Sequence, residues 1–200
     1  YLLKTDVGSG EALLLDVAPL AEGERIHPGG IFLHGERLLV PLAPTKDRPD
    51  TYVLAVDPDR LSIEHLFTVD AHIGAIAFDG EGTLFGADFD TGRLYFWTID
   101  GVEKAVVPNP TTIAYQDMEW YKSRLYCSGV DKRDRSRGRV DVYAYDDDTR
   151  TVVLEKSYLL PTIAPRTSLG REGMTIYDGR FQFLPEDDED TTLYAIEASP

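Results

Sequence analysis

One pattern occurs four times along this chain of 200 residues and constrains its fold more than any other feature. Each copy has a cluster of polar or small residues, a short apolar run, a tight turn and a second apolar run. The copies begin at His27, His72, Tyr115 and Arg171, and their turns carry Gly35, Gly80 with Gly82, Lys122 with Ser123, and Asp178 with Gly179. Because these turn residues suit tight hairpins, each copy predicts two antiparallel strands.

A third predicted strand follows each hairpin, with an aromatic residue near its start and an acid at its end: 51–57, 93–100, 141–147 and 192–197. A fourth follows in three of the copies, at 62–69, 103–108 and 151–159. Units of four short strands repeated every ~40 to 55 residues are typical of a β-propeller. An antiparallel sandwich is the alternative, but it gives no reason for the same polar cluster before every hairpin. We therefore predict an all-β fold, a β-propeller of four-stranded antiparallel blades, as one domain over residues 1–200.

The number of blades depends on the N-terminal part of the chain. Residues 1–6 and 11–17 resemble a third and a fourth strand without the first two, so third strands number five and first strands four. Either an upstream first hairpin is missing from this sequence, or residues 11–17 close the fourth blade after 192–197. Both explanations remain open at this stage, and we expect about five blades.

The net charge of the chain limits the classes of molecule that it can bind. Thirty-five acidic and twenty basic residues give a formal charge of −15, which repels nucleic acid and anionic membranes. No apolar stretch has the length of a membrane span. No signal peptide is visible, but the sequence starts at Tyr1, so both a secreted or periplasmic and a cytoplasmic location remain open. We expect a small polar molecule or a protein as the partner, and we expect the single Cys127 to be a buried, inert thiol.

The recurrent polar clusters define the candidate site. In a propeller the first strands surround the central channel, so residues just before them gather at one rim. We therefore predict an axial pocket ringed by His27, His72, Gln116, Asp117, Arg171 and Glu172. We expect Gly29, Gly30, Gly74 and Gly173 to relieve crowding near the axis.

Two interpretations of this ring stay open. The side chains either hydrogen-bond to the backbone and tie the blades together, or they bind a ligand. In the second case His27, His72, Asp117 and Glu172 would hold one divalent cation, calcium or a transition metal. Acids at 186–190, together with Asp88 and Asp90, are weaker candidates that suit solvated turns.

Five motifs carry a family resemblance: "IHPGGI" (26–31), "AHIGAI" (71–76), "YQDMEW" (115–120), "YCSGV" (126–130) and "FLPEDD" (183–188). As a set they resemble an uncharacterised β-propeller family, a domain of unknown function grouped with YncE-like and strictosidine-synthase-like repeats. The resemblance implies one more repeat before the first seen here, which favours the missing hairpin. Ala71 and Ala114 stand where this family often has Asp, and both changes remove carboxylates from the expected ring.

Three functions follow as hypotheses. The first is binding of a small ligand or cation in the axial pocket. The second is a metal-dependent hydrolase or lactonase, which similar six-bladed propellers are, with His27 or His72 as the base. The third is a protein-interaction scaffold with an exposed aromatic patch from Trp97, Trp120 or Tyr121, although both tryptophans suit packing between blades better.

Overall fold

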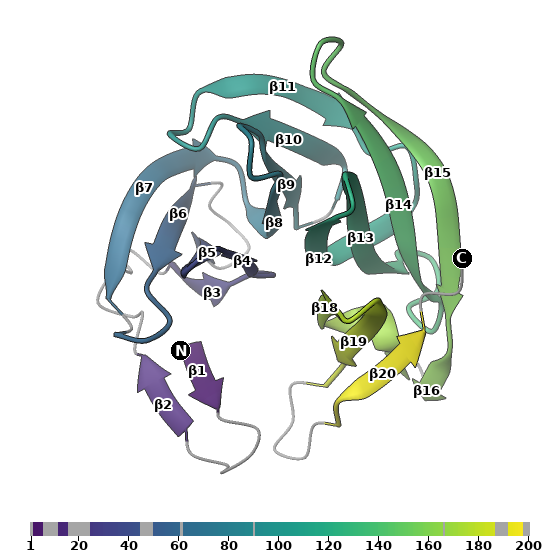
Figure 1. Cartoon of the computed structure of the whole chain (residues 1–200). Coiled ribbons are helices and arrows are strands. Elements are labelled where there is room, and N and C mark those ends of the chain that lie inside the picture. Colours follow the sequence, from purple (N-terminus) through teal and green to yellow (C-terminus); the bar gives the residue numbers. More distant parts are fainter. Residues whose placement is uncertain are drawn as a thin grey trace.

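The computed structural model describes residues 2–5, 12–15, 25–44, 50–60, 62–89, 91–165, 167–186 and 192–197. These residues form small antiparallel sheets arranged around a common axis, with the first strand of each sheet innermost (Figure 1). The prediction of an all-β propeller is confirmed. In the described part of the chain, no helix has the length and apolar character of a membrane span.

Four sheets follow the four sequence repeats. Blade 1 contains β3 (Arg25–Pro28), β4 (Phe32–His34), β5 (Arg37–Pro44), β6 (Asp50–Val56) and β7 (Ile63–Asp70), with β3 and β4 both paired to β5. Blade 2 contains β8 (Ile73–Phe78), β9 (Leu84–Asp88), β10 (Arg93–Trp97) and β11 (Glu103–Pro108). Blade 3 contains β12 (Ile113–Tyr121), β13 (Arg124–Asp131), β14 (Gly138–Asp146) and β15 (Thr151–Leu160). Blade 4 contains β18 (Gly173–Tyr177), β19 (Arg180–Leu184) and β20 (Tyr194–Glu197).

Five further elements, two hairpins and a 3-10 helix, lie outside these four blades in the described chain. A small hairpin of β16 (Thr162–Ala164) and β17 (Thr167–Ser168) leads into the 3-10 helix η2 (Leu169–Arg171) before blade 4, and the repeat pattern did not predict it. At the N-terminal side, β1 (Leu2–Thr5) pairs with β2 (Ala12–Leu15). Since the sheet of β20 contains β18 and β19 and not β2, residues 12–15 do not close the fourth blade in this structure.

The hairpin turns adopt the backbone that their residues predicted. Lys122 and Ser123 have φ of 48° and 58°, and Asp178 and Gly179 have φ of 50° and 72°. Two consecutive residues with positive φ are the mark of a type I′ turn, whose twist matches that of the flanking strands. These turns fix the register of β12 on β13 and of β18 on β19.

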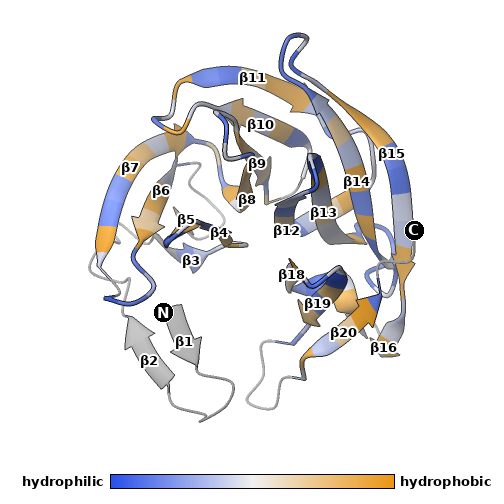
Figure 2. Cartoon of the chain, viewed as in Figure 1, coloured by the Kyte–Doolittle hydropathy of each residue, from blue (hydrophilic) through white to orange (hydrophobic). Residues whose placement is uncertain are grey.

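Aromatic side chains hold neighbouring blades together. Trp120 of blade 3 stacks on Phe85 of blade 2, with ring centroids 5.2 Å apart, and Trp97 of blade 2 lies 6.1 Å from Phe67 of blade 1. Such ring pairs contribute about 0.5 to 1.5 kcal/mol beyond the area that they bury. Trp97 is only 2% exposed, so the expectation of packing between blades is confirmed. Toward the outside, β7, β11 and β15 mix hydrophilic and hydrophobic residues (Figure 2), as half-exposed strands do.

Close backbone approach near the axis explains two glycines. The amide N–H of Gly30 donates to the carbonyl oxygen of Gly74 at 2.8 Å, and Gly30 forms a parallel bridge with Ala75. A Cβ at Gly30 would lie 2.5 Å from Oδ1 of Asp117, and one at Gly29 would collide with the Gly74 carbonyl. The expectation that small residues relieve crowding is confirmed at these two positions.

Candidate functional site: an axial cavity

A cavity of about 290 Å³ lies among the innermost strands of blades 1, 3 and 4. Its described lining comes from the β4–β5 hairpin and the residue before it, from β12, from β18 and β19, and from the approach to β20. The lining residues are Ile31, Leu33, Leu38, Asp117, Glu119, Gly173, Met174, Thr175, Gln182, Leu184 and Leu193. Six of these side chains are aliphatic or methionine, so the cavity is mostly apolar.

The mouth of the cavity is apolar as well. Ile31, Leu33, Leu184 and Leu193 are between 37% and 57% exposed, although they are large hydrophobic residues. Exposed aliphatic side chains gathered at one opening, rather than scattered over the surface, mark a place where an apolar group can be buried.

Asp117 is the first of two carboxyl groups in this lining. It is 4% exposed; its Oδ1 accepts the N–H of Met118 at 2.9 Å, and its Oδ2 accepts the N–H of Met174 at 2.8 Å. Burial raises the pKa of Asp117 well above its ordinary value, against the lowering effect of these two hydrogen bonds. Because Met174 belongs to β18, Asp117 ties blade 3 to blade 4 through the backbone.

Glu119 is the second carboxyl group, two residues further along β12 and therefore on the same face of the strand. Its Oε1 accepts the hydroxyl of Thr175 at 2.6 Å, and it also accepts the backbone N–H of Ile176. Burial raises the pKa of Glu119 from 4.5 to about 6, and the two hydrogen bonds oppose that rise. Glu119 is therefore mostly ionised at neutral pH, although it faces an apolar cavity.

Of the six residues that the sequence analysis placed in one ring, Asp117 is the one that lies in the described lining of this cavity. His27 and His72 lie together elsewhere, with ring centroids 6.2 Å apart and both rings against Phe89. Arg171 pairs with its neighbour Glu172 at 3.3 Å.

The backbone of Gln116 borders the cavity region without its side chain lining it. Its carbonyl oxygen is one of the atoms that a Cβ on Gly30 would meet, at 2.5 Å. Gln116 lies at the bulge in the pairing of β12 with β13, between Tyr115 and Asp117, and it does not belong to the described lining. The described lining is an apolar wall with two carboxyl groups.

The expected ligand set for a cation is not assembled in the described part of the chain. No three His, Cys, Asp or Glu side chains there lie close enough together to hold one metal ion. The physical reason is visible in the four candidates: both oxygens of Asp117 accept backbone N–H groups, Glu172 faces Arg171, and His27 and His72 pack on Phe89. Of the weaker acidic candidates, residues 187–190 and Asp90 lie outside the described residues, and Asp88 caps its turn by accepting the N–H of Gly92.

Glu119 is the site residue that sequence reasoning missed. The repeat comparison directed attention to the residues just before each first strand, whereas Glu119 lies inside one, in "YQDMEW". The available signal was the alternation along residues 117, 119 and 121, since side chains two apart on a strand share a face. An acid on the same face as a predicted axial Asp117 was the clue.

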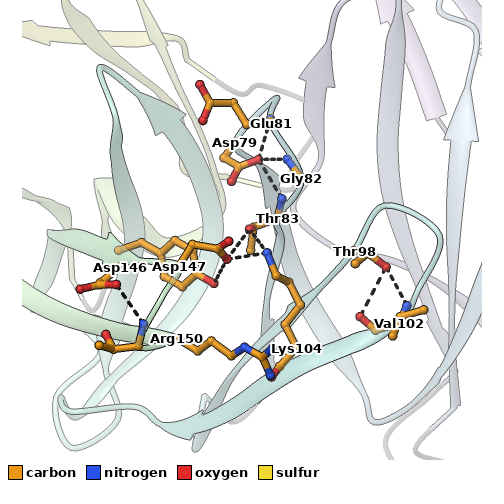
Figure 3. A network of polar contacts seen from close by, with 12 residues as sticks. Asp79, Glu81, Gly82, Thr83, Thr98, Val102, Lys104, Asp146, Asp147 and Arg150 are labelled. Atoms are coloured by element: carbon orange, nitrogen blue, oxygen red, sulfur yellow. Dashed lines mark hydrogen bonds and ion pairs between the residues drawn. The ribbon is translucent and has the colours of Figure 1, made fainter.

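A second polar region lies at the joint between blades 2 and 3 (Figure 3). Nζ of Lys104, on β11, donates to Oδ1 of Asp147 at 2.5 Å and to Oγ1 of Thr83 at 2.8 Å. The hydroxyl of Tyr145 donates to the same Asp147 oxygen at 2.8 Å. The Lys104 ammonium group lowers the pKa of Asp147, so this carboxylate is ionised and matched by a cation.

Comparison with known proteins places the chain in a family. A model of a family of unknown function, DUF6454, matches residues 1–199. The chain belongs to this family. The part of the predicted resemblance that named an uncharacterised family is thereby confirmed. No curated protein matches the sequence.

Solved structures support the propeller fold of this DUF6454 member. A calcium-binding regucalcin from Agrobacterium tumefaciens has a TM-score of 0.59 at 13% identity, over 94% of this chain and 62% of that one. A gluconolactonase from Xanthomonas campestris has a TM-score of 0.56 at 16% identity, over 90% and 61%. A protein of unknown function from Bacteroides caccae has a TM-score of 0.50 at 9% identity, over 82% and 59%. The chain thus spans about three fifths of the length of these structures.

Proposed function

We propose that this DUF6454 propeller binds a small molecule with an apolar body in the axial cavity. The observation that carries the proposal is the cavity itself: about 290 Å³, walled by Ile31, Leu33, Leu38 and Met174, with the Glu119 carboxyl group in its lining. Ligand pockets in proteins are mostly apolar, with a few polar groups that orient the ligand, and they begin at ~300 Å³. The volume favours a ligand of one ring or a short branched chain.

The other two hypotheses have less support from the described residues. A metal-dependent hydrolase or lactonase, a hypothesis that the similarity to the Xanthomonas campestris gluconolactonase brings to mind, needs a ligand set that the described residues do not assemble. A scaffold was expected to expose Trp97, Trp120 or Tyr121, but Trp97 is buried, Trp120 stacks on Phe85 between blades and Tyr121 is half-buried. Ligand binding needs neither feature.

A variant that fills the cavity tests the proposal. A Cβ at Gly173 would be 3.8 Å from Oδ2 of Asp117, which is ordinary contact, so Gly173→Ala is tolerated and Gly173→Leu projects further into the lined space. Benzyl alcohol, a neutral probe of one ring, is titrated into isotope-labelled protein. We expect amide shifts in the NMR spectrum that are concentrated at Met174, Thr175 and Leu184.

The matched control is Gly82→Leu, a glycine with nothing within 4 Å of its Cβ position and outside the described cavity lining. Gly173→Leu should weaken benzyl alcohol binding at least tenfold, and Gly82→Leu should leave it unchanged. Equal binding by wild type and Gly173→Leu, or shifts that do not involve the cavity, would contradict the proposal.

A further inference from the structure

We infer that the ligand of the axial cavity is an organic cation, an apolar body carrying a protonated primary or secondary amine that pairs with Glu119. The inference rests on the proposed function, since it names the chemical class of the molecule bound in that same cavity. The inference follows from three observations: the charge of the described lining, the hydrogen-bond acceptor positions of Glu119, and the lack of aromatic rings among the described lining residues.

The lining, as far as its described residues go, has negative groups and no positive one. Among its described residues, Asp117 and Glu119 are the titratable groups, and neither the β4–β5 hairpin nor β18 and β19 contribute a charged side chain. Several described Lys and Arg side chains form ion pairs away from this lining, such as Arg37 with Glu64, Lys104 with Asp147, and Arg124 with Glu155. A carboxylate in an apolar wall without a protein cation is costly, and a ligand cation offsets that cost.

The two carboxyl groups are not equivalent partners for such a cation. Asp117 is buried, and each of its oxygens accepts a backbone N–H. Burial raises its pKa, which weakens Asp117 as a partner for a cation. Glu119 titrates near pH 6, and a carboxylate has about four acceptor positions, of which the Thr175 hydroxyl and the Ile176 N–H occupy two. Asp117 accepts two hydrogen bonds as well, but it is 4% exposed, whereas Glu119 is only half-buried, so Glu119 is the carboxylate that a ligand can reach.

The surroundings favour an amine with N–H groups over a quaternary ammonium. Proteins bind quaternary ammonium groups by enclosing them in aromatic rings, and no Phe, Tyr or Trp appears in the described lining. A protonated amine can instead donate charge-assisted hydrogen bonds to Glu119. The formal charge of −15 on the whole chain also attracts cations and repels anionic ligands on approach.

Four probes with one apolar body test the inference: benzylamine, benzyltrimethylammonium, benzyl alcohol and phenylacetate, titrated at pH 7.5 and low salt with NMR or calorimetric detection. We expect benzylamine to bind about tenfold more tightly than benzyl alcohol, a difference of about 1.4 kcal/mol. Benzyltrimethylammonium should bind more weakly than benzylamine, and phenylacetate should bind least.

The pH dependence of binding gives a second readout. Between pH 5 and pH 7.5 benzylamine affinity should rise about tenfold as Glu119 loses its proton, while benzyl alcohol affinity stays constant.

Glu119→Gln supplies the decisive variant, because it removes the charge and keeps the shape of the side chain. It should bring benzylamine to within about twofold of benzyl alcohol and abolish the pH dependence, with benzyl alcohol binding retained as evidence of an intact cavity. Glu64→Gln, which removes an exposed carboxylate of β7 paired with Arg37, is the control and should behave as wild type.

The outcomes separate the inference from the proposed function. If benzyl alcohol binds as tightly as benzylamine, or if Glu119→Gln keeps the preference for the amine, the inference is wrong and the binding cavity stands. Tighter binding of benzyltrimethylammonium than of benzylamine overturns the hydrogen-bonded amine. If no probe binds, both the inference and the proposed function fail.

Discussion

Two carboxyl groups of blade 3, those of Asp147 and Glu119, differ in what surrounds them. Asp147, at the joint with blade 2, meets the Lys104 ammonium at 2.5 Å, and this partner lowers its pKa. Glu119, at the axis, has an apolar wall in front of it, and burial raises its pKa to about 6. The carboxylate of Asp147 is thus paired with a cation of the protein itself, whereas the carboxylate of Glu119 is available to pair with a cation of the ligand. The difference distinguishes a contact that joins blades from a group available for binding.

The largest expected effect is on folding stability, at Asp117, the other carboxyl group of the cavity lining. Asp117→Ala leaves the buried N–H groups of Met118 and Met174 without their acceptor. Since each unsatisfied buried donor costs about 1 to 3 kcal/mol, we expect a loss of about 2 to 4 kcal/mol in the free energy of unfolding. Urea denaturation measures it; a loss below 0.5 kcal/mol, on the scale of ordinary surface substitutions, would show that Asp117 does not tie blades 3 and 4 together.

An intermediate effect is expected at Glu119, in the pH dependence of stability. The folded protein holds the Glu119 proton up to about pH 6, whereas an ordinary Glu releases it near 4.5, so unfolding releases a proton within this window. Stability therefore falls as pH rises through the window, by on the order of 2 kcal/mol at pH 7. Glu119→Gln should lack this fall and be the more stable protein at pH 7.

Thermal or urea unfolding of the two proteins between pH 4 and 7.5 measures this difference. Asp117 also has a raised pKa, mainly from burial and in smaller part from the charge of Glu119, so the larger, burial-driven part is common to both proteins and the smaller part is lost in Glu119→Gln. Parallel stability curves over the whole range would mean that Glu119 is not destabilised by its surroundings, and the contrast with Asp147 would disappear.

The smallest effect is expected at the joint. Lys104→Met keeps an apolar chain of similar length and removes the cation from Asp147, whose side chain is 61% exposed. Exposed ion pairs contribute about 0.2 to 1 kcal/mol and are screened by salt. We expect a loss of about 0.5 kcal/mol that vanishes in 1 M NaCl, measured by urea denaturation at both salt concentrations. A loss above 2 kcal/mol, or one that salt leaves unchanged, would make the joint more than a screened surface pair.

Much of the fold was predictable because hairpin chemistry is local. The residue pairs Lys122 with Ser123 and Asp178 with Gly179 adopt the left-handed backbone of type I′ turns, and the strands on either side of them follow from period-two alternation. Cys127 is buried, and burial raises its pKa well above the ordinary value, as expected for an inert thiol. The β16–β17 hairpin escaped prediction because it belongs to no repeat.

The candidate site was predicted only in part, because it depends on how far each first strand reaches toward the axis. Asp117 lies in the described cavity lining, and His27, His72, Arg171 and Glu172, which the repeat comparison grouped with it because each precedes a first strand, do not. A bulge in the pairing of β12 with β13, between Tyr115 and Asp117, is a shift that no local pattern showed. It decides which residues of β12 share a face with Asp117.

The sequence by itself determined the repeat, the hairpins and the need for small residues at the axis, since turn conformation and strand alternation depend on neighbouring residues. Only the tertiary structure decided that Glu119 faces the aliphatic side chains of blades 1 and 4 and that Lys104 lies beside Asp147. The surroundings that shift a carboxyl group come from residues distant in the chain. For that reason the chemical character of the cavity became visible only with the blades in place.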